Sequence, residues 1–455
     1  MIKKILIANR SEIAVRIIRT CKEMNIQTVA VYSKADKDAL HVQLANEAIC
    51  IGDNASKDSY LNINNILQAA CSSGCDAIHP GFGFLSENAH FAKLVEECGL
   101  IFIGPNHEII SKLGDKNSAR QLMMEAGVSV IPGSKDIVTS VEEGIVKANE
   151  LGYPVLVKAS SGGGGRGMRK ILCEEEFEEN YNNAKAEALA CFKDDNVYLE
   201  KFIEEPKHIE VQIVADRHGN VIHLFERDCS LQRRNQKLLE EAPCHSLNKT
   251  IRKKLINEAV KAAKFLKYDS VGTIEFLLDK HNNFYFMEMN TRLQVEHTIT
   301  EMITGIDIVK QQIKIADNQK LSIKQEDIKL NGHAIECRIN AESVKNNFAP
   351  SAGKINFINF PGGRGVRIDT AVYNGYFVQP YYDSMIMKLI TFAPTRLECI
   401  KKMRIALEEL IIDGIDTNIE FHYLMLYNKK VIEGKYNTNF MESFMEEIFK
   451  NGELI

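Results

Sequence analysis

The sequence predicts an α/β protein of several domains, the first of them built on a parallel, doubly wound sheet. The chain has 455 residues, which at about 150 residues per domain leaves room for about three domains. Hydrophobic residues make up 45% and charged residues 26%, as in ordinary globular proteins and unlike disordered or collagen-like chains. Over residues 1–104, short apolar strands alternate with amphipathic helices, which is the pattern of a parallel sheet covered by helices.

The elements expected in this first domain are strands at 5–8, 27–32, 48–51, 76–79 and 101–104, and helices at 12–24 and 88–98. In the first helix, Ile13, Ile17 and Ile18 fall on one face. Residues 9–12 and 80–83 directly follow strands, at the sheet edge where such folds bind ligands. No G-x-G-x-x-G run indicates a dinucleotide site, and the spacing alone is equally compatible with a scaffold domain.

A smaller domain is expected next, with strands at 153–159, 168–173 and 197–203 and a helix at 174–191. Longer strands follow at 208–215, 221–227, 273–278 and 283–288, covered by helices at 249–266 and 396–410. The chain contains no repeat and no low-complexity linker, so we expect the domains to pack together.

Charge and cysteine content indicate the compartment and exclude some partners. Lys and Arg number 56 against 61 Asp and Glu, a net charge of −5, so the basic signature of a nucleic-acid-binding protein is missing. The eleven cysteines form no C-x-x-C pair and are expected to be buried thiols in a reducing compartment. No apolar run is long enough for a membrane span or a signal peptide. We expect a cytoplasmic protein with neither a nucleic-acid nor a membrane partner.

The sharpest motif is a run of four consecutive glycines flanked by Lys158 and Arg166. Glycine backbones can approach phosphate oxygens closely, and the two cations favour a triphosphate ligand over the alternative of a plain flexible hairpin. The order of a Walker loop is absent. The expected phosphate-binding residues of this run are Lys158, Gly163, Gly164, Gly165, Arg166 and Gly167.

Two glutamates in neighbouring apolar runs predict a metal site. The turn-like residues 280–283 separate Glu275 from Glu288, so a β-hairpin would place the two carboxylates side by side. Burying such a pair is costly unless a cation neutralises it. Oxygen ligands beside a nucleotide, with Asn290 close by, favour Mg²⁺ or Mn²⁺; solvated strand positions are the alternative.

A third group, Arg292, Gln294 and Glu296, occupies every second position. In an extended chain these side chains share one face, where an arginine could bind a small anion, an amide orient it and a carboxylate act as a base. An exposed polar strand face fits this spacing equally well. The adjacent His297 is expected to be a structural histidine.

Taken in order, these and other motifs resemble those of biotin carboxylases, which are ATP-grasp enzymes, over essentially the whole chain. No single motif is decisive, but their order is highly specific. The matching runs are Ile7-Ala8-Asn9-Arg10, His79-Pro80-Gly81, Gly83-Phe84-Leu85-Ser86-Glu87-Asn88, Gly114-Asp115-Lys116, 158–168, Glu226-Arg227-Asp228-Cys229-Ser230, Gln232-Arg233-Arg234, Glu240-Glu241-Ala242-Pro243, Glu288-Met289-Asn290-Thr291-Arg292, Gln294-Val295-Glu296-His297, 336–342 and Tyr381-Tyr382-Asp383-Ser384-Met385.

The resemblance implies a Rossmann-like N-terminal domain at 1–113, an ATP-grasp lid at 131–203, an ATP-grasp body with metal and bicarbonate sites at 204–330, and a biotin carboxylase C-terminal domain at 331–447. It implies that ATP lies between lid and body. The implied nucleotide contacts beyond the glycine run are Lys116, Glu200, Lys201, Ile203, His208 and Gln232.

The resemblance also implies how the remaining residues act on bicarbonate and biotin. It assigns two Mg²⁺ or Mn²⁺ ions to Glu275, Glu288 and Asn290, bicarbonate binding to Arg292, Gln294 and Val295, and removal of the bicarbonate proton to Glu296, with Lys237 nearby. Arg338 would face the ureido oxygen of biotin, close to Phe82; without the resemblance, an ion pair of Arg338 with Glu336 or Glu342 is as good an interpretation.

Three residues depart from the family pattern. Ser11 replaces a glycine, which would cause backbone strain if that position needs a positive φ. Phe82 stands where tyrosine is usual, and Asn235 where histidine is frequent. The last two substitutions bear on nucleotide and biotin affinity and leave the reaction class unchanged.

The chain contains no Ala-Met-Lys-Met biotinylation site and ends soon after the matched region. We therefore expect the biotin carboxylase subunit of an acetyl-CoA carboxylase, a homodimer working with a separate biotin carboxyl carrier protein and carboxyltransferase subunits. A subunit of a pyruvate or other acyl-CoA carboxylase is the first alternative. Another ATP-grasp ligase, or an ATP-binding protein without catalysis, is the second.

Overall fold

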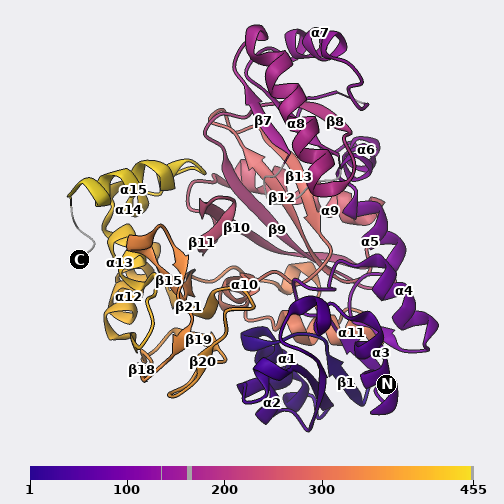
Figure 1. Ribbon diagram of the computed structural model, residues 1–455, viewed down its shortest axis with the longest axis vertical. Coiled ribbons are helices and arrows are strands. Elements are labelled where there is room, and N and C mark those ends of the chain that lie inside the picture. The colour runs from indigo at the N-terminus through magenta and orange to yellow at the C-terminus, as the bar shows by residue number, and fades with distance from the viewer. Residues whose placement is uncertain (135, 161–166, 452–455) are drawn as a thin grey trace.

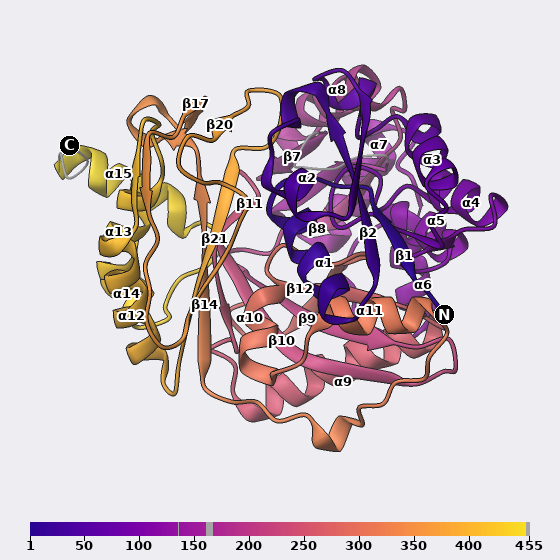
Figure 2. The same cartoon turned by 90° about the horizontal axis from the view of Figure 1, so that it is seen from below.

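The computed structural model (Figure 1) describes residues 1–134, 136–160 and 167–451. An N-terminal sheet lies at the bottom of the view, a small lid at the top, and a long sheet crosses the space between them. Seen from below, the C-terminal helices cover one end of the long sheet and the N-terminal domain lies at the other end (Figure 2). The predicted α/β class is confirmed.

The N-terminal sheet is entirely parallel, with the order β3-β2-β1-β4-β5. Helix crossovers between its strands account for the predicted alternation, and Ile13, Ile17 and Ile18 on α1 are buried. Two more helices, α5 and α6, lead to the lid. The elements are β1 (Lys4–Ile7), α1 (Ser11–Glu23), β2 (Gln27–Ser33), α2 (Leu40–Leu44), β3 (Glu47–Gly52), α3 (Ile63–Ser72), β4 (Ala77–His79), α4 (Ala89–Glu97), β5 (Ile101–Phe102), α5 (His107–Gly114) and α6 (Lys116–Glu125).

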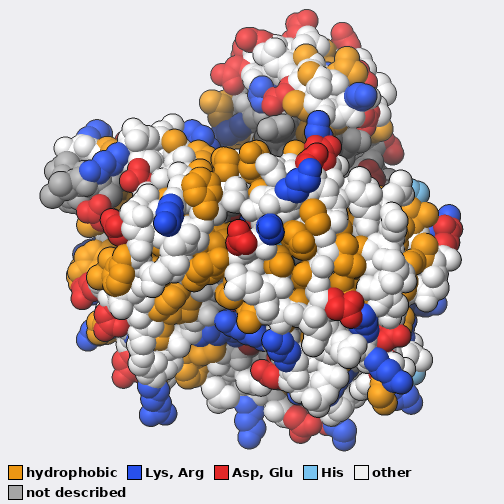
Figure 3. Space-filling model, turned by 60° about the horizontal axis from the view of Figure 1, so that its bottom comes forward, with side chains coloured by type: hydrophobic (Ala, Val, Ile, Leu, Met, Phe, Trp, Pro, Cys, Tyr) orange, Lys and Arg blue, Asp and Glu red, His pale blue; other side chains and the backbone are white. Residues whose placement is uncertain are grey.

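The lid is a three-stranded antiparallel sheet, β7-β6-β8, with its own apolar core formed with α7 and α8. It stands out from the body as a separate lobe (Figure 3). The predicted helix starts later than expected, because the three glutamates at 174–176 form a 3-10 turn before α8. The lid elements are α7 (Val141–Leu151), β6 (Val155–Ala159), β7 (Met168–Ile171), α8 (Phe177–Phe192) and β8 (Val197–Lys201).

The long sheet has eight strands in the order β13-β12-β9-β10-β11-β14-β21-β19, and it is antiparallel throughout. The pairing of β11 with β14 joins the region before residue 330 to the region after it. Its strands and the helices of the body are β9 (Lys207–Ala215), β10 (Val221–Arg233), β11 (Gln236–Ala242), α9 (Lys249–Phe265), β12 (Val271–Leu278), β13 (Phe284–Asn290), α10 (His297–Thr304), α11 (Ile308–Ala316), β14 (His333–Asn340), β19 (Val366–Thr370) and β21 (Met385–Ala393).

Short strand pairs and helices complete the C-terminal part around one large apolar cluster. They are β15 (Glu342–Ser343), β16 (Ala349–Pro350), β17 (Gly353–Lys354), β18 (Phe357–Asn359), β20 (Phe377–Val378), α12 (Arg396–Glu409), β22 (Ile411–Asp413), α13 (Ile419–Tyr427), α14 (Lys429–Ile432) and α15 (Phe440–Asn451).

Strand β10 is longer than predicted, and the sequence analysis missed β11. The prediction ended at Arg227, but β10 continues to Arg233 and turns at Arg234 and Asn235 into β11. Both turn residues have positive φ, at 49° and 63°, and asparagine tolerates this conformation well. The hydrophobic pattern fails here because the charged residues of these strands are buried beside partners of opposite charge.

The cysteine prediction was partly wrong. All eleven thiols are free, but only six are buried, Cys173 is half-buried, and Cys50, Cys71, Cys98 and Cys191 are exposed. Within the described residues, no helix combines the length and apolar character needed to cross a membrane.

Ser11, where the resemblance suggested strain, has a φ of 57°. This left-handed conformation costs an L-residue roughly 1–2 kcal/mol, and glycine escapes that cost but loses more chain entropy on folding. We therefore expect Ser11→Gly to raise the free energy of unfolding by about 0.5–1 kcal/mol, measured by urea denaturation. Ser11→Ala keeps the Cβ atom and should give no gain; a gain of equal size in that control would refute the strain.

Candidate functional site

A cleft of about 1290 Å³ lies between the lid, the long sheet and the N-terminal domain. The two predicted strand ends meet at its wall, where Asn9 Nδ2 donates to the carbonyl oxygens of Pro80 and Phe82, each at 2.7 Å. The cleft is lined by the following predicted site residues: Phe82, Lys116, Lys158, Glu200, Lys201, Ile203, His208, Gln232, Lys237, Glu275, Glu288, Asn290, Arg292, Gln294, Val295, Glu296 and Arg338.

The glycine run is described only at its ends. Gly163, Gly164, Gly165 and Arg166 lie outside the described residues. Gly167 is buried against the lid helix α8 with a φ of 68°, and a Cβ atom there would lie 2.9 Å from the Cβ of Ala159. Gly167 is therefore required by the local backbone conformation and is not among the residues that line the cleft.

The lid side of the cleft presents lysines beside carboxylates. Lys158 on β6 lies 2.5 Å from Glu200 on the neighbouring strand β8. Lys116, at the first turn of α6, lies 3.9 Å from Glu288 on β13. Lys201 instead donates to the carbonyl oxygens of residues 152 and 153, so its ammonium group is engaged within the lid.

The predicted hairpin with paired glutamates is confirmed. Glu275 on β12 and Glu288 on β13 are direct partners in the register. Burial opposes ionisation of Glu275, but Lys237 at 3.1 Å and His208 at 2.8 Å outweigh it and hold the pKa of Glu275 below its ordinary value.

The pKa of Glu288 is shifted in the opposite direction from that of its partner Glu275. Burial and the adjacent Glu275 carboxylate raise the pKa of Glu288, so a cation bound between the two would stabilise its charged form. Asn290 adds an amide to the same end of the hairpin and donates to Glu275 at 2.8 Å. An all-oxygen donor set of two carboxylates and one amide fits Mg²⁺.

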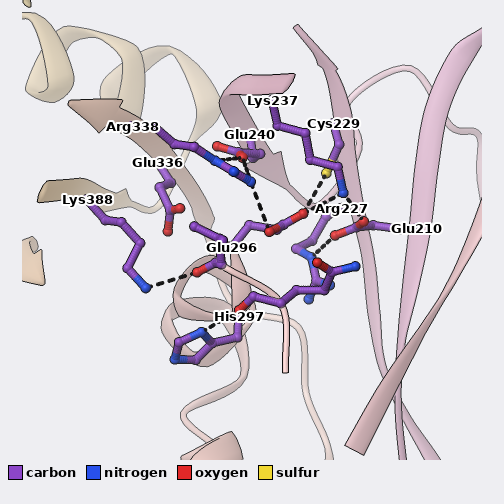
Figure 4. Close-up of polar contacts among 12 residues, drawn as sticks. Glu210, Arg227, Cys229, Lys237, Glu240, Glu296, His297, Glu336, Arg338 and Lys388 are labelled. Carbon is purple, nitrogen blue, oxygen red and sulfur yellow. Dashed lines mark hydrogen bonds and ion pairs between the residues drawn. The ribbon is translucent and has the colours of Figure 1, made fainter. Parts of the chain in front are cut away.

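Lys237 is the centre of a buried charge cluster (Figure 4). Its Nζ atom lies 2.6 Å from Glu210, 3.1 Å from Glu275 and 2.6 Å from Glu296. Burial opposes the ammonium form, yet the carboxylates outweigh it and hold the pKa of Lys237 well above its ordinary value. One lysine on β11 thus joins strands β9 and β12 to the start of α10.

Glu296 lies between two cations at the floor of the cleft. Its second oxygen is 3.1 Å from Arg338 on β14, on the side away from Lys237 (Figure 4). Burial and the Glu210 carboxylate oppose ionisation of Glu296, but the surrounding cations outweigh them, so the pKa of Glu296 is lowered. The group is a carboxylate at neutral pH.

Arg338 pairs with neither Glu336 nor Glu342, the partners weighed from the sequence. It contacts Glu240 on β11 at 2.5 Å in addition to Glu296. Glu240 and Glu336 are register partners across β11 and β14. Burial raises the pKa of Glu240 to about 7 and holds the pKa of Glu336 well above its ordinary value. Arg338 therefore lies among more buried acid groups than it can neutralise, and it remains cationic.

The extended conformation considered for residues 292–296 is not found. Strand β13 ends at Asn290, residues 291–296 form a loop, and α10 starts at His297. The loop forms because its polar side chains bind groups on different elements. Arg292 contacts Glu87 at 2.8 Å and Gln294 at 2.9 Å, while Gln294 donates to Glu275 at 3.2 Å.

The sequence analysis assigned no role to several residues of this site. Glu210 carries a recognisable signal, because it is an acidic residue in an apolar strand, as Glu275 is. Glu240 and Arg227 lie in segments that were not predicted in full, and Glu87 was quoted only as part of a motif. Arg227 is buried and lies 2.5 Å from Glu210.

Comparison with known proteins gives three family matches that together span most of the chain. Residues 1–110 match the biotin carboxylase N-terminal domain, 115–324 the ATP-binding domain of the carbamoyl-phosphate synthase L chain, and 336–443 the biotin carboxylase C-terminal domain. Biotin carboxylase 1 of Bacillus subtilis is 55% identical and covers 98% of this chain and 99% of its own length. The 2-oxoglutarate carboxylase small subunit of Hydrogenobacter thermophilus is 52% identical, over 97% of this chain and 93% of its own length.

Solved structures that resemble this chain are biotin carboxylases as well. The chain resembles a biotin carboxylase–βγ-ATP complex from Campylobacter jejuni with a TM-score of 0.95 and 50% identity, over 97% of this chain and 99% of that one. It also resembles the biotin carboxylase domain dimer of the Hydrogenobacter thermophilus 2-oxoglutarate carboxylase, solved with MgADP, ADP and bicarbonate. That match has a TM-score of 0.93 and 52% identity, over 97% of this chain and 98% of that chain.

Proposed function

Because the chain belongs to the biotin carboxylase family, an ATP-dependent group of ATP-grasp ligases, we propose that it acts as the biotin carboxylase subunit of a multi-subunit carboxylase. The reaction of the family uses ATP, Mg²⁺ and bicarbonate, with biotin as the acceptor. The single observation that supports the assignment of roles most strongly is the Glu296 carboxylate, buried at the floor of the cleft between Lys237 and Arg338.

Glu296 removes the proton of bicarbonate in this proposal. The anion binds to Arg292, Gln294 and the backbone of Val295, and its deprotonated oxygen attacks the γ-phosphoryl group of ATP. The bond to ADP breaks as carboxyphosphate forms. Lys116 and Lys158 face the phosphates and spread their charge.

The nucleotide lies between the lid and the body. In this proposal the adenine base lies beside Glu200, Lys201 and Ile203. The ribose lies beside His208 and Gln232. Glu275, Glu288 and Asn290 would hold the metal, which supplies neutralisation of the phosphate charge. We propose two such ions, with Mn²⁺ as an alternative to Mg²⁺, and Gly163, Gly164, Gly165 and Arg166 as further phosphate contacts. Gly167, which packs inside the lid, is left out of the proposed contacts.

Arg338 acts in the second half of the reaction. Carboxyphosphate breaks down to CO₂ and phosphate, phosphate accepts the proton of the biotin ureido nitrogen, and that nitrogen attacks CO₂. Arg338 stabilises the negative charge that develops on the ureido oxygen. Phe82, on the adjacent cleft wall, contacts the biotin ring without offering a hydroxyl group.

The proposed assembly contains two copies of this chain, a separate biotin carboxyl carrier protein and carboxyltransferase subunits. We propose that the complete enzyme to which these subunits belong is acetyl-CoA carboxylase. A 2-oxoglutarate or pyruvate carboxylase is the alternative, since relatives of about the same identity carry those names. The free thiols support the cytoplasm as the proposed location.

The test is ADP release by the purified chain with Mg²⁺ and ATP, in buffer freed of dissolved CO₂. Release that requires added bicarbonate and is stimulated by free biotin supports the proposal. Release indifferent to biotin would leave an ATP-grasp enzyme with another acceptor. Adding candidate carrier proteins one at a time then identifies the complex, by transfer of labelled bicarbonate to the carrier.

Lys237→Gln should change the pH dependence of this reaction. Lys237 is a cation that lowers the pKa of Glu296, so its removal raises that pKa, and Glu296 becomes protonated at a higher pH. The acid limb of bicarbonate-dependent ATP cleavage is therefore expected to move to higher pH, measured as kcat/KM for bicarbonate against pH. Arg252→Gln breaks an ion pair with Glu226 outside the cleft and should leave the acid limb in place. An unmoved limb in Lys237→Gln would contradict the role of Glu296 as the base.

A further inference from the structure

Two buried side chains without a role in the proposed mechanism, His297 and Lys388, hold the backbone of the loop that ends at Glu296 (Figure 4). His297 Nδ1 lies 2.8 Å from the carbonyl oxygen of Gln294. Lys388 Nζ donates to the carbonyl oxygen of Val295 at 3.0 Å. Two successive peptide groups are thus each anchored through their oxygen atoms.

The anchored carbonyls determine where the amides of the loop point. In a trans peptide, N–H and C=O point in opposite directions, so the N–H groups of Val295 and Glu296 point away from His297 and Lys388. Both residues line the cleft. In the described part of the chain neither amide has a hydrogen-bond partner. Adjacent free amides of this kind form a binding site for a small anion.

His297 serves as a neutral donor. Burial lowers the pKa of His297 well below its ordinary value, and the cations Lys388 and Arg16 lower it further. A neutral imidazole carries one proton, and the Gln294 oxygen places that proton on Nδ1. Nε2 has no partner among the described residues, so the contact with the loop is the ring's hydrogen bond.

Lys388 links three parts of the chain at the loop. Lys388 lies on β21 as the register partner of Arg338 on β14. Lys388 contacts Val295 and Arg338 contacts Glu296, so two paired strand residues hold two consecutive residues of the loop. The Lys388 ammonium group also lies 3.2 Å from Glu12 on α1. The orientation of the loop therefore depends on contact between the N-terminal domain and the long sheet.

Stability alone does not explain a lysine at this position. The Lys388 side chain is 0% exposed, and a buried ion pair is generally no more stabilising than apolar residues of the same size. An apolar side chain cannot donate to the Val295 carbonyl oxygen. The hydrogen bond to the loop therefore requires the ammonium group, as does the ion pair with Glu12.

We propose that His297 and Lys388 are positioning residues that orient the amides of Val295 and Glu296 for bicarbonate. The inference rests on the proposed binding of bicarbonate to Arg292, Gln294 and Val295. It concerns bicarbonate and not ATP, because in the described part of the chain neither side chain contacts a residue assigned to ATP.

The test measures KM for bicarbonate and for ATP in folded variants. Lys388→Met alone would leave Glu12 buried without its cation, so the variant is Glu12→Gln combined with Lys388→Met. His297→Leu removes the donor to Gln294, whereas His297→Asn restores an N–H group close to the position of Nδ1. Arg396→Met, which breaks a buried ion pair with Glu241 away from the cleft, is the matched control.

We expect the bicarbonate KM to rise about tenfold to hundredfold in the double variant and in His297→Leu. The ATP KM should stay within about twofold, His297→Asn should recover most of the loss, and Arg396→Met should leave the bicarbonate KM unchanged. If the double variant does not fold, the two His297 variants decide the question.

Three results would overturn the inference: an unchanged bicarbonate KM, an equal rise in Arg396→Met, or an equal rise in the ATP KM. Arg292→Gln distinguishes this failure from failure of the proposed site. If Arg292→Gln raises the bicarbonate KM and the His297 and Lys388 variants do not, only the positioning role is wrong. If Arg292→Gln also leaves it unchanged, the bicarbonate site itself has been misassigned.

Discussion

Glu296→Gln is expected to lower bicarbonate-dependent ATP cleavage by about 10²–10⁴-fold, the usual contribution of a general base. The amide keeps the size of the side chain but cannot accept the bicarbonate proton. It also removes the negative charge between Lys237 and Arg338. The measurement is kcat for ADP release at saturating bicarbonate, with ATP binding followed separately by equilibrium titration.

Binding of ATP should persist in this variant, because the side-chain contacts of Glu296 among the described residues are with Lys237, Arg338 and Cys229, none of which is assigned to the nucleotide. Glu240→Gln is the comparison, since Glu240 is a buried glutamate that also contacts Arg338 but has no assigned proton transfer. It should retain far more ATP cleavage than Glu296→Gln. Near-normal turnover in Glu296→Gln would remove Glu296 from the mechanism.

Arg338→Gln is expected to lower biotin carboxylation by about 10²–10³-fold, as for loss of a group that stabilises a developing oxyanion. Bicarbonate-dependent ATP cleavage without biotin should suffer less, because Arg338 acts on the ureido oxygen and only borders Glu296. The two rates are measured in parallel, as labelled carboxybiotin formed and ADP released. The expected signature is ADP release that is no longer stimulated by biotin.

Arg338→Lys tests whether charge alone is sufficient. The guanidinium contacts Glu240 through Nε and Glu296 through Nη2, a forked arrangement that a single ammonium group cannot reproduce. We expect the lysine variant to recover only a small part of the lost carboxylation. Equal losses of both reactions in Arg338→Gln would instead indicate that Arg338 acts through Glu296.

Much of the fold was predictable because its signals are local. The N-terminal alternation of strands and helices, the lid strands around the glycine run and the hairpin of Glu275 and Glu288 all follow from short-range periodicity and turn residues. The predictions fell short where charge interrupts the hydrophobic pattern. Strand β10 continues past Arg227 through Asp228, and β11 contains Glu240; both residues are buried only because distant partners neutralise them.

The candidate site also has one part that the sequence predicts and another part that only the structure shows. By itself, the sequence determined the class of fold, the motifs for phosphate, metal and anion, and the residues Glu275, Glu288, Arg292, Glu296 and Arg338. Only the tertiary structure decided which groups neutralise one another. Lys237 meets three carboxylates, Arg338 meets Glu240 from 98 positions away, and Lys388 reaches Val295 from 93 positions away. The physical reason is that strand register and domain packing bring these charges together, and no local pattern records which distant partner a buried charge will find.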